Sequence, residues 1–192
     1  MGQYFRAVSL DVNEAVRPFG AKMVEHSWVG NTFLSKVERL LSPGNKWHKT
    51  RIVWAGDYMT PGIFMYKNPK YPDLTLYGLS HEWADAGDPG DGPEPRYLIN
   101  HIKNLYINLK DIPVVKDYRG IKVRPIKVHP LPVLTATSIG EGSGDYGDTD
   151  DENIGTWAGD VLSTDYQRPK GMKKYKDLFV YPYGRPETEE TK

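Results

Sequence analysis

The chain has 192 residues and a mass of 21.8 kDa, a length that favours one domain, placed here at 1–181 and followed by a C-terminal tail at 182–192. It contains no cysteine, which excludes disulfides, thiolate metal sites and cysteine nucleophiles. Lysine plus arginine and aspartate plus glutamate number 25 each, and no apolar run reaches the ~18 residues of a membrane span. We therefore expect a soluble, cytoplasmic protein with neither a membrane nor nucleic acid as its partner.

Two hairpins of similar pattern are predicted in the chain. Residues 4–10 have the composition of a strand and 11–14 that of a tight turn. Residues 15–17 would return antiparallel, before proline and glycine interrupt the hydrogen bonds between the two strands. The second hairpin joins strands at 96–101 and 105–109. The match between the two is too short to indicate a duplicated domain.

One amphipathic helix is predicted at 32–41. Its apolar side chains recur with the 3.6-residue period of a single helix face, whereas its polar side chains occupy the other face. Asn31 or Thr32 can cap the beginning of this helix, and the Ser42-Pro43-Gly44 run stops it. A shorter helix is predicted at 21–28.

Glycine and proline, 19 and 15 residues, together with many β-branched and aromatic residues, indicate a chain built mostly of short strands and turns. We therefore predict an α+β fold, a mainly antiparallel twisted sheet or partly open barrel with the one helix packed on it. Further strands are predicted at 51–55, 63–66, 74–77, 120–123, 131–137 and 156–163.

Charge is unevenly distributed along the sequence. Residues 82–95 contain five acidic residues and 140–155 contain six, with no basic residue in either segment, and both are rich in glycine. We interpret both as surface loops, with Asp145 of the second as a candidate ligand contact. Weak calcium binding by this second loop is an alternative, although its spacing is not that of a helix–loop–helix site. The basic and aromatic segment at 103–127 is interpreted as an exposed sheet edge protected by lysine and arginine, and the alternative is a strand face that binds nucleic acid.

The tetrapeptide Trp-Ala-Gly-Asp occurs twice, ending at Asp57 and at Asp160. Each copy places a carboxylate beside a large aromatic, Trp54 or Trp157, and the first copy is followed by Tyr58. Two such carboxylates facing one cleft could act as an acid and base pair or bind a ligand hydroxyl. The alternative is that each tryptophan fills the core while each aspartate caps its own turn.

Two of the five histidines are candidates for a site. His26 shares one side of the predicted helix at 21–28 with Lys22 and Glu25, a group that could hold an anion or move a proton, or could be a solvated helix face. His129 stands before prolines that restrict its backbone, as a packing residue or a site residue. No pair of histidines has the spacing of a local zinc site, so no metal is expected.

Four segments of the chain resemble segments of uncharacterised bacterial and phage-encoded proteins. The resemblance implies a bacterial or viral setting, with the host cytoplasm as the location if the gene is carried by a phage. It implies no activity and no catalytic residue. The segments are Met1-Gly2-Gln3-Tyr4, Glu25-His26-Ser27 with Gly30-Asn31, Val53-Trp54-Ala55-Gly56-Asp57-Tyr58 and His129-Pro130-Leu131-Pro132.

Small-molecule sites combine aromatic walls with a few polar groups, and this chain has 13 tyrosines and 5 tryptophans. We therefore predict a small-molecule or nucleotide-binding protein with an aromatic and acidic pocket, and no particular cofactor is indicated. The alternatives are a hydrolase that uses the two paired aspartates and a histidine, and a protein-interaction module whose acidic loops meet a basic partner. The candidate site residues are Glu25, His26, Trp54, Asp57, Tyr58, His129, Asp145, Trp157 and Asp160.

Overall fold

The structure is a computed structural model that describes residues 3–17, 21–58, 70–71, 73–118, 121–137 and 153–175. It has an α+β fold with a mostly antiparallel, mixed sheet of nine strands that stays open rather than closing into a barrel. This confirms the predicted fold class. Residues 182–192 and the predicted strand at 63–66 lie outside the described residues.

The nine strands follow the spatial order β11-β7-β6-β10-β4-β1-β2-β5, with β3 also paired to β1, and a separate ribbon is formed by β8 and β9. Two of the pairings, β2 with β5 and β11 with β7, are parallel. The strands are β1 (Tyr4–Ser9), β2 (Glu14–Ala15), β3 (Ala21–Lys22), β4 (Thr50–Gly56), β5 (Ala84–Asp85), β6 (Tyr97–Asn100), β7 (Leu105–Asn108), β8 (Val115–Tyr118), β9 (Ile121–Ile126), β10 (Val161–Asp165) and β11 (Lys173–Lys174). The helices are α1 (Met23–His26), α2 (Thr32–Leu40), α3 (Leu76–Leu79), α4 (Pro130–Thr135) and the 3-10 turn η1 (Leu109–Asp111).

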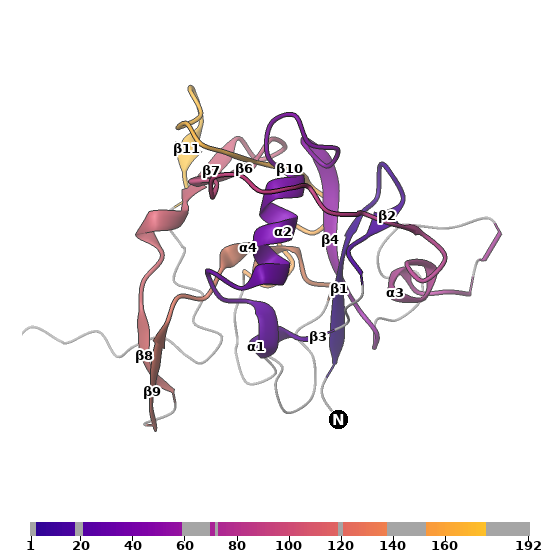
Figure 1. Ribbon diagram of the computed structural model, residues 1–192, viewed down its shortest axis with the longest axis horizontal. Helices are drawn as coiled ribbons and strands as arrows, with labels where there is room; N and C mark the ends of the chain where they lie inside the picture. Colours follow the sequence, from indigo (N-terminus) through magenta and orange to yellow (C-terminus); the bar gives the residue numbers. More distant parts are fainter. Residues whose placement is uncertain are drawn as a thin grey trace, which may run out of the picture.

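Strand β4 joins two halves of the sheet. Its residues Ile52–Gly56 pair with β1, whereas its first two residues, Thr50 and Arg51, pair with β10. In Figure 1, β1 and β4 stand upright while β10, β6 and β7 run across the top of the molecule, and α2 and α4 lie below them. The Thr164 N–H of β10 donates to the Leu41 carbonyl, at 3.1 Å, which fastens the end of α2 to the upper half.

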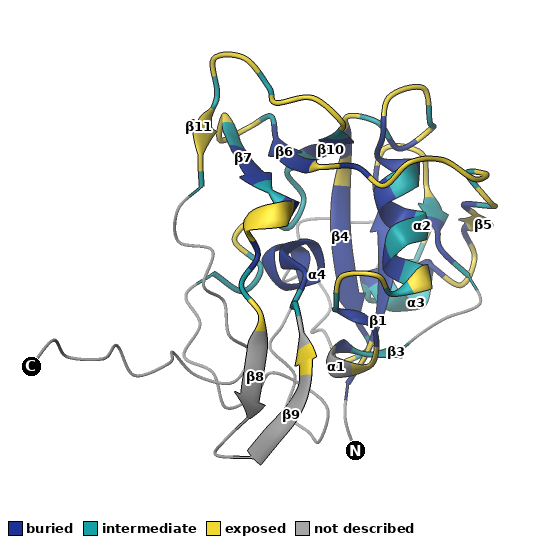
Figure 2. Cartoon of the chain, turned by 60° about the vertical axis from the view of Figure 1, so that its left-hand side comes forward, coloured by how far each residue is buried: buried dark blue, intermediate teal, exposed yellow. Residues whose placement is uncertain are grey.

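The main core fills the space between α2, α4 and one face of the sheet. Figure 2 shows β4, α4 and the inner side of α2 as buried. Trp54, Leu34 and Val37 are among its fully buried side chains. A second cluster lies on the other face of β1 and β4, where Val8 and Val53 pack beneath α3. The β1–β4 pair is therefore covered on both faces, which explains its nearly continuous apolar sequence.

The predicted helix at 32–41 is confirmed as α2, and the Asn31 side chain caps it by accepting from the Phe33 N–H at 3.0 Å. The strand predicted at 156–163 begins only at Val161, as β10, because the residues before it form turns. Two further predicted strands were wrong. Residues 74–77 begin the helical turn α3, which Thr75 caps through its side-chain oxygen. Residues 131–137 contain most of α4, where proline occupies the first turn and tolerates the missing N–H. The helix predicted at 21–28 is reduced to the four residues of α1 behind the short strand β3.

The acidic segment at 82–95 is a largely exposed loop, as predicted, although it contributes the edge strand β5 and buries Ala86 and Trp83. The second acidic segment lies outside the described residues up to residue 152. The basic segment at 103–127 is divided between β7, η1 and the β8–β9 ribbon.

Candidate functional site

His26 is buried between α1 and β4, with 2% of its surface exposed. The Trp54 indole N–H donates to His26 Nε2 at 2.7 Å, and His26 Nδ1 lies 2.7 Å from the Lys22 carbonyl. This pairing requires a neutral ring that accepts at Nε2 and donates at Nδ1. Burial lowers the pKa of His26 to about 4, because the charged form would lose its hydration. His26 is therefore a core residue that orients Trp54, and its ring is almost fully shielded from solvent.

His129 holds the opposite tautomer. Its Nδ1 accepts the Leu131 N–H at 3.1 Å and so caps α4, while its Nε2 lies 2.9 Å from Glu38 Oε1. The Nε2–H is thus the donor to the Glu38 carboxylate, and both side chains are almost fully buried. The backbone carbonyl of Glu38 also accepts the Thr164 hydroxyl at 2.6 Å. This network ties α2, α4 and β10 together, which is a structural role.

The two Trp-Ala-Gly-Asp copies share a sequence but not a conformation. Trp54 and Trp157 are both fully buried in the main core. Gly56 is the last residue of β4, where a Cβ atom would stand 2.1 Å from the end of the Gln3 side chain, which would then have to move. Gly159 instead lies in a turn at a φ of 75°. Both tryptophans therefore have the core-filling role that the sequence offered as the alternative.

Asp57 and Asp160 lie at opposite ends of β4. Asp57 exchanges hydrogen bonds with Tyr4, its N–H donating to the Tyr4 carbonyl and its Oδ1 accepting the Tyr4 N–H, both at 3.0 Å. Asp160 accepts the Ile52 N–H through its carbonyl at 3.3 Å. Five residues of extended chain separate Ile52 from Asp57, about 16 Å at ~3.3 Å per residue. The structure does not bring the two carboxylates to one site.

Asp160 has its own local partners at the junction of the two halves. Its Oδ2 accepts the Asn100 side-chain amide at 2.7 Å and pairs with Lys103 Nζ at 2.6 Å. The Asn100 side-chain oxygen in turn accepts the N–H groups of the turn that follows β6. Asp160 therefore fixes the β6–β7 turn against the beginning of β10.

Arg6 is the centre of a polar cluster at the Asp57 end of β1. Only 6% of this residue is exposed, its Nη1 donates to Ser80 Oγ at 3.0 Å, and its guanidinium lies 5.0 Å from the centre of the Tyr77 ring. The His81 ring contacts Tyr77 edge to face at 5.4 Å. We call Tyr4, Arg6, Arg17, Asp57, Tyr77 and His81 the Arg6 cluster.

Positive charge is concentrated in the Arg6 cluster. Burial lowers the pKa of Arg6, and the nearby Arg17 lowers it further. The pKa of His81 is lowered by burial and then by both arginines. Arg17 is fixed by donating to the carbonyls of His81 and Trp83, the latter at 2.7 Å. These effects show that the two arginines and the His81 ring lie within electrostatic reach of one another, and that a bound anion would favour the charged forms of these groups.

Of the nine candidate residues, Asp57 belongs to the Arg6 cluster and Tyr58 follows it directly, with 54% of its surface exposed. The Glu25 carboxylate accepts the Lys22 N–H at 2.9 Å and so caps the N-terminus of α1. Asp145 lies outside the described residues. Sequence reasoning missed Arg6, Arg17, Tyr77 and His81. The sequence did mark Arg6 as a candidate, because a charged residue stands inside a largely apolar strand that the structure shows to be buried.

We found no match to this chain among protein-family models, curated proteins or solved structures. The resemblance to bacterial and phage-encoded proteins therefore stays a prediction. None of the described helices has the length and apolar character needed to cross a membrane. Within the described ranges, histidines and carboxylates nowhere gather in threes around a point that could take a metal ion.

Proposed function

We propose that this protein binds a small anionic molecule, a nucleotide or another phosphorylated compound, at the Arg6 cluster. The observation that carries the proposal is the buried Arg6 guanidinium, which Tyr77 and Ser80 hold in one position beside Arg17 and His81. A guanidinium that is held in one orientation beside a second arginine gives a fixed centre of positive charge, which attracts a phosphate with little further loss of side-chain entropy.

Exposed aromatic side chains stand at the same end of β1 and β4. Tyr4 is 42% exposed and Tyr58 54% exposed, so either ring offers a face on which a base or another planar group can stack. One oxygen of Asp57 accepts the Tyr4 N–H. The second carboxylate oxygen can accept a ligand hydroxyl, such as that of a ribose, while it disfavours a phosphate placed directly beside it.

The hydrolase alternative needs two carboxylates within ~5–10 Å of each other. The backbone separation of about 16 Å between Ile52, which Asp160 contacts, and Asp57 does not provide that arrangement. The Arg6 cluster supplies positively charged and aromatic binding groups, and we therefore propose binding rather than hydrolysis.

The test is a thermal-shift and calorimetric screen of the full chain against mononucleotides, inorganic phosphate and sugars. A ligand at 100 times its Kd adds about 2.7 kcal/mol of stability, a readily measured rise in Tm. We expect nucleotides to stabilise the protein, Arg6→Gln to abolish this, and Tyr58→Ala to weaken it several-fold without loss of stability, because that ring is exposed. Val12→Ala, which changes a similarly exposed apolar side chain in the turn between β1 and β2, is the control. A wild-type protein that no nucleotide and no phosphate stabilises would overturn the proposal.

A further inference from the structure

The outer face of the upper half of the sheet carries its own aromatic cluster. Along β6 and β7, Leu98 and Ile107 point into the main core, whereas Tyr97, Ile99 and Tyr106 point to the opposite side and pack with Met172. The Tyr97 and Tyr106 rings meet edge to face, with centres 5.9 Å apart. No residue of a described helix belongs to this cluster, and its one further apolar contact in the described residues is Met172, just before β11.

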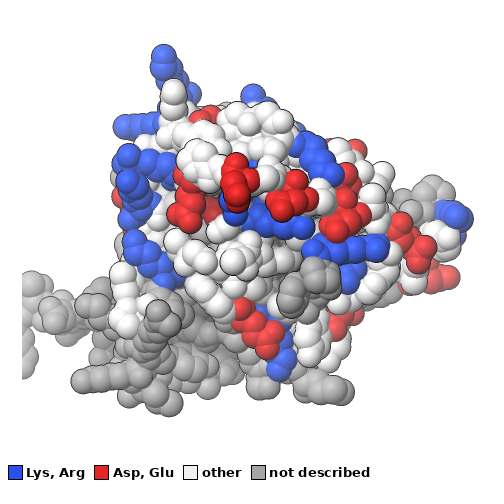
Figure 3. All heavy atoms as spheres, in the orientation of Figure 1, with Lys and Arg blue, Asp and Glu red and all other residues white. Residues whose placement is uncertain are grey.

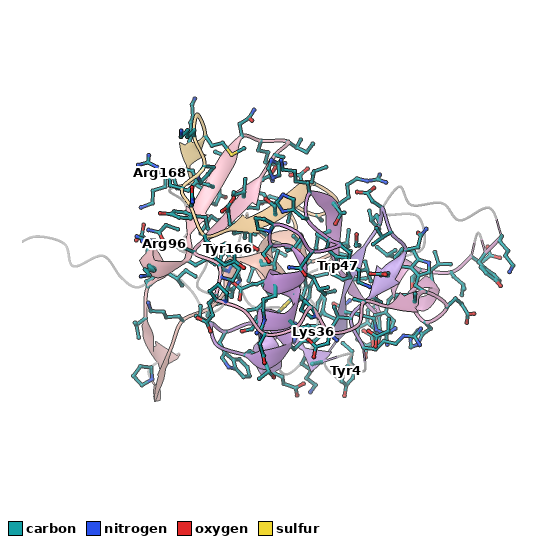
Figure 4. All side chains as sticks on the ribbon, turned by 45° about the horizontal axis from the view of Figure 1, so that its top comes forward. Tyr4, Lys36, Trp47, Arg96, Tyr166 and Arg168 are labelled. Carbon is teal, nitrogen blue, oxygen red and sulfur yellow. The ribbon has the colours of Figure 1, made fainter. Side chains whose placement is uncertain are left out.

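Two exposed arginines cover these rings. The Arg96 guanidinium lies 5.5 Å from the centre of Tyr97, and that of Arg168 lies 5.4 Å from the centre of Tyr106. Figure 4 shows both arginines on the same flank of the molecule, with Tyr166 near them. An arginine stacked on an aromatic ring is held flat, while its N–H donors stay accessible at the edge of the guanidinium.

The same region has an excess of positive charge. Lys174 pairs with Asp111 and Lys103 pairs with Asp160. Five further basic groups form no ion pair within the described part of the chain, and Figure 3 shows lysines and arginines gathered on the flank where β7 and β11 lie. These five are Arg96, Lys110, Arg168, Lys170 and Lys173.

Protection of a sheet edge explains only part of this pattern. Lysines on the edge strand β11 discourage pairing with another chain, as expected for an exposed edge. Arg96 precedes β6, which lies between β7 and β10 in the interior of the sheet. Edge protection does not account for an arginine stacked on a tyrosine of an interior strand.

We propose that this Tyr–Arg face, defined by Arg96, Tyr97, Tyr106, Tyr166 and Arg168 with the surrounding lysines, binds single-stranded nucleic acid. The arginines and lysines would contact successive phosphates of an extended strand. The guanidinium planes and the exposed ring of Tyr166, 39% exposed, offer surfaces for bases to stack on. An acidic peptide would satisfy the charge but would leave the planar surfaces unused, which is why nucleic acid fits better.

This proposal does not rest on the proposed function, because the Tyr–Arg face and the Arg6 cluster share no residue and lie on different strands. It revises the expectation drawn from the neutral overall charge of the chain. That expectation could not include Arg96 and Arg168, which are 72 positions apart in sequence and reach the same face through the pairing of β6 with β7 and with β10.

The experiment is fluorescence anisotropy of the full chain with labelled oligo(dT) and oligo(rU) of about 20 nucleotides, titrated at several salt concentrations. We expect binding that weakens with salt, with a slope in log K against log [salt] of about −2 to −3 for three to four phosphates contacted. The double variant Arg96→Gln/Arg168→Gln should bind at least tenfold more weakly, with a slope closer to zero by about 1.4. Tyr166→Ala should weaken binding without changing the slope.

Lys36→Gln on α2, well apart from the Tyr–Arg face in Figure 4, is the control and should bind as the wild type does. Arg6→Gln should also keep oligonucleotide binding, which separates this proposal from the nucleotide site. Circular dichroism checks that each variant is folded. Equal losses in Lys36→Gln and the double variant, binding of polyglutamate as tight as that of the oligonucleotides, or no oligonucleotide binding at low salt would each overturn the proposal.

Discussion

Among single residues, His26 has the strongest consequence for pH dependence. Burial holds its pKa at about 4 in the folded chain, against 6.5 for an ordinary histidine. The unfolded chain therefore takes up a proton at His26 as the pH falls below about 6.5, while the folded chain does so only near 4. The contribution of neutral His26 to the free energy of unfolding is therefore fully present above pH 6.5 and is lost as the pH falls from 6.5 to 4. The loss is about 3 kcal/mol, at ~1.4 kcal/mol per pH unit.

This prediction is checked by urea unfolding of the wild type and His26→Gln at pH values from 7.5 to 4. We expect the free energy of unfolding of the wild type to fall more steeply with decreasing pH than that of the variant, because glutamine does not titrate. The histidine resonances in NMR give the pKa of His26 directly. Parallel pH profiles for the two proteins would contradict the assignment of a neutral, buried ring.

The role of His26 could not be read from its sequence neighbours. Its position beside Glu25 predicted a polar group on a helix face, but its partner is Trp54, 28 residues away, which donates from β4. His129 is different, because the prolines that follow it predicted a fixed ring, and the ring does cap α4. Local patterns thus indicated where a side chain is restrained, whereas the partner depended on strand pairing.

Among the elements, α2 supports the sharpest prediction. Val37 is fully buried on the face that meets the core, and Val37→Asp would place a carboxylate there without a partner. We expect a loss of about 4 kcal/mol or more in the free energy of unfolding, enough to unfold many domains. The adjacent Lys36→Gln is the control and should change stability by no more than about 0.5 kcal/mol. Similar Tm values for the two variants would mean that α2 presents a different face to the core.

The elements differ in how well their sequences predict them. Helix α2 has a full apolar face, an Asn31 cap and a stop signal, and these local features agree with the structure. Helix α4 reads as a strand because Leu131, Val133 and Thr135 alternate, yet it is buried on all sides and needs no polar face. Proline in the first turn and the His129 cap favour the helix over the β-propensity of its side chains. The periodicity of apolar residues does not distinguish a helix from a strand when every side of the element is buried.

For the whole molecule, the class of fold followed from composition but the order of the strands did not. Strand β10 comes late in the chain and inserts between β6 and β4, and both of these partners lie far earlier in the sequence, where no local pattern marks them as its neighbours. The Arg6 cluster and the Tyr–Arg face both depend on such pairings. A single sequence shows the apolar pattern of each strand, while the choice among similar partners is made by packing.

The sheet organisation predicts a gradient of local stability. Strands β1, β4, β10 and β6 have neighbours on both sides, whereas β5 and β11 are exposed two-residue edge strands. We expect hydrogen–deuterium exchange to be slowest in β4 and β1, where both faces are also covered, and fast in β5 and β11. Mass spectrometry of peptic peptides measures this directly. Protection in β11 equal to that in β4 would contradict the open sheet.

The shortness of both edge strands also bears on how copies of this chain behave when crowded together. A free edge recruits another chain only if it offers a long run of unpaired N–H and C=O groups, and here each edge offers two residues. Lys173 and Lys174 add repulsion between two such edges, and the Asp85 side-chain oxygen accepts the N–H groups of Arg17 and Gly87. The two ends of the nine-stranded sheet thus offer little template for fibrillar polymerisation through added strands, so we expect association at β5 and β11 only after the fold itself opens.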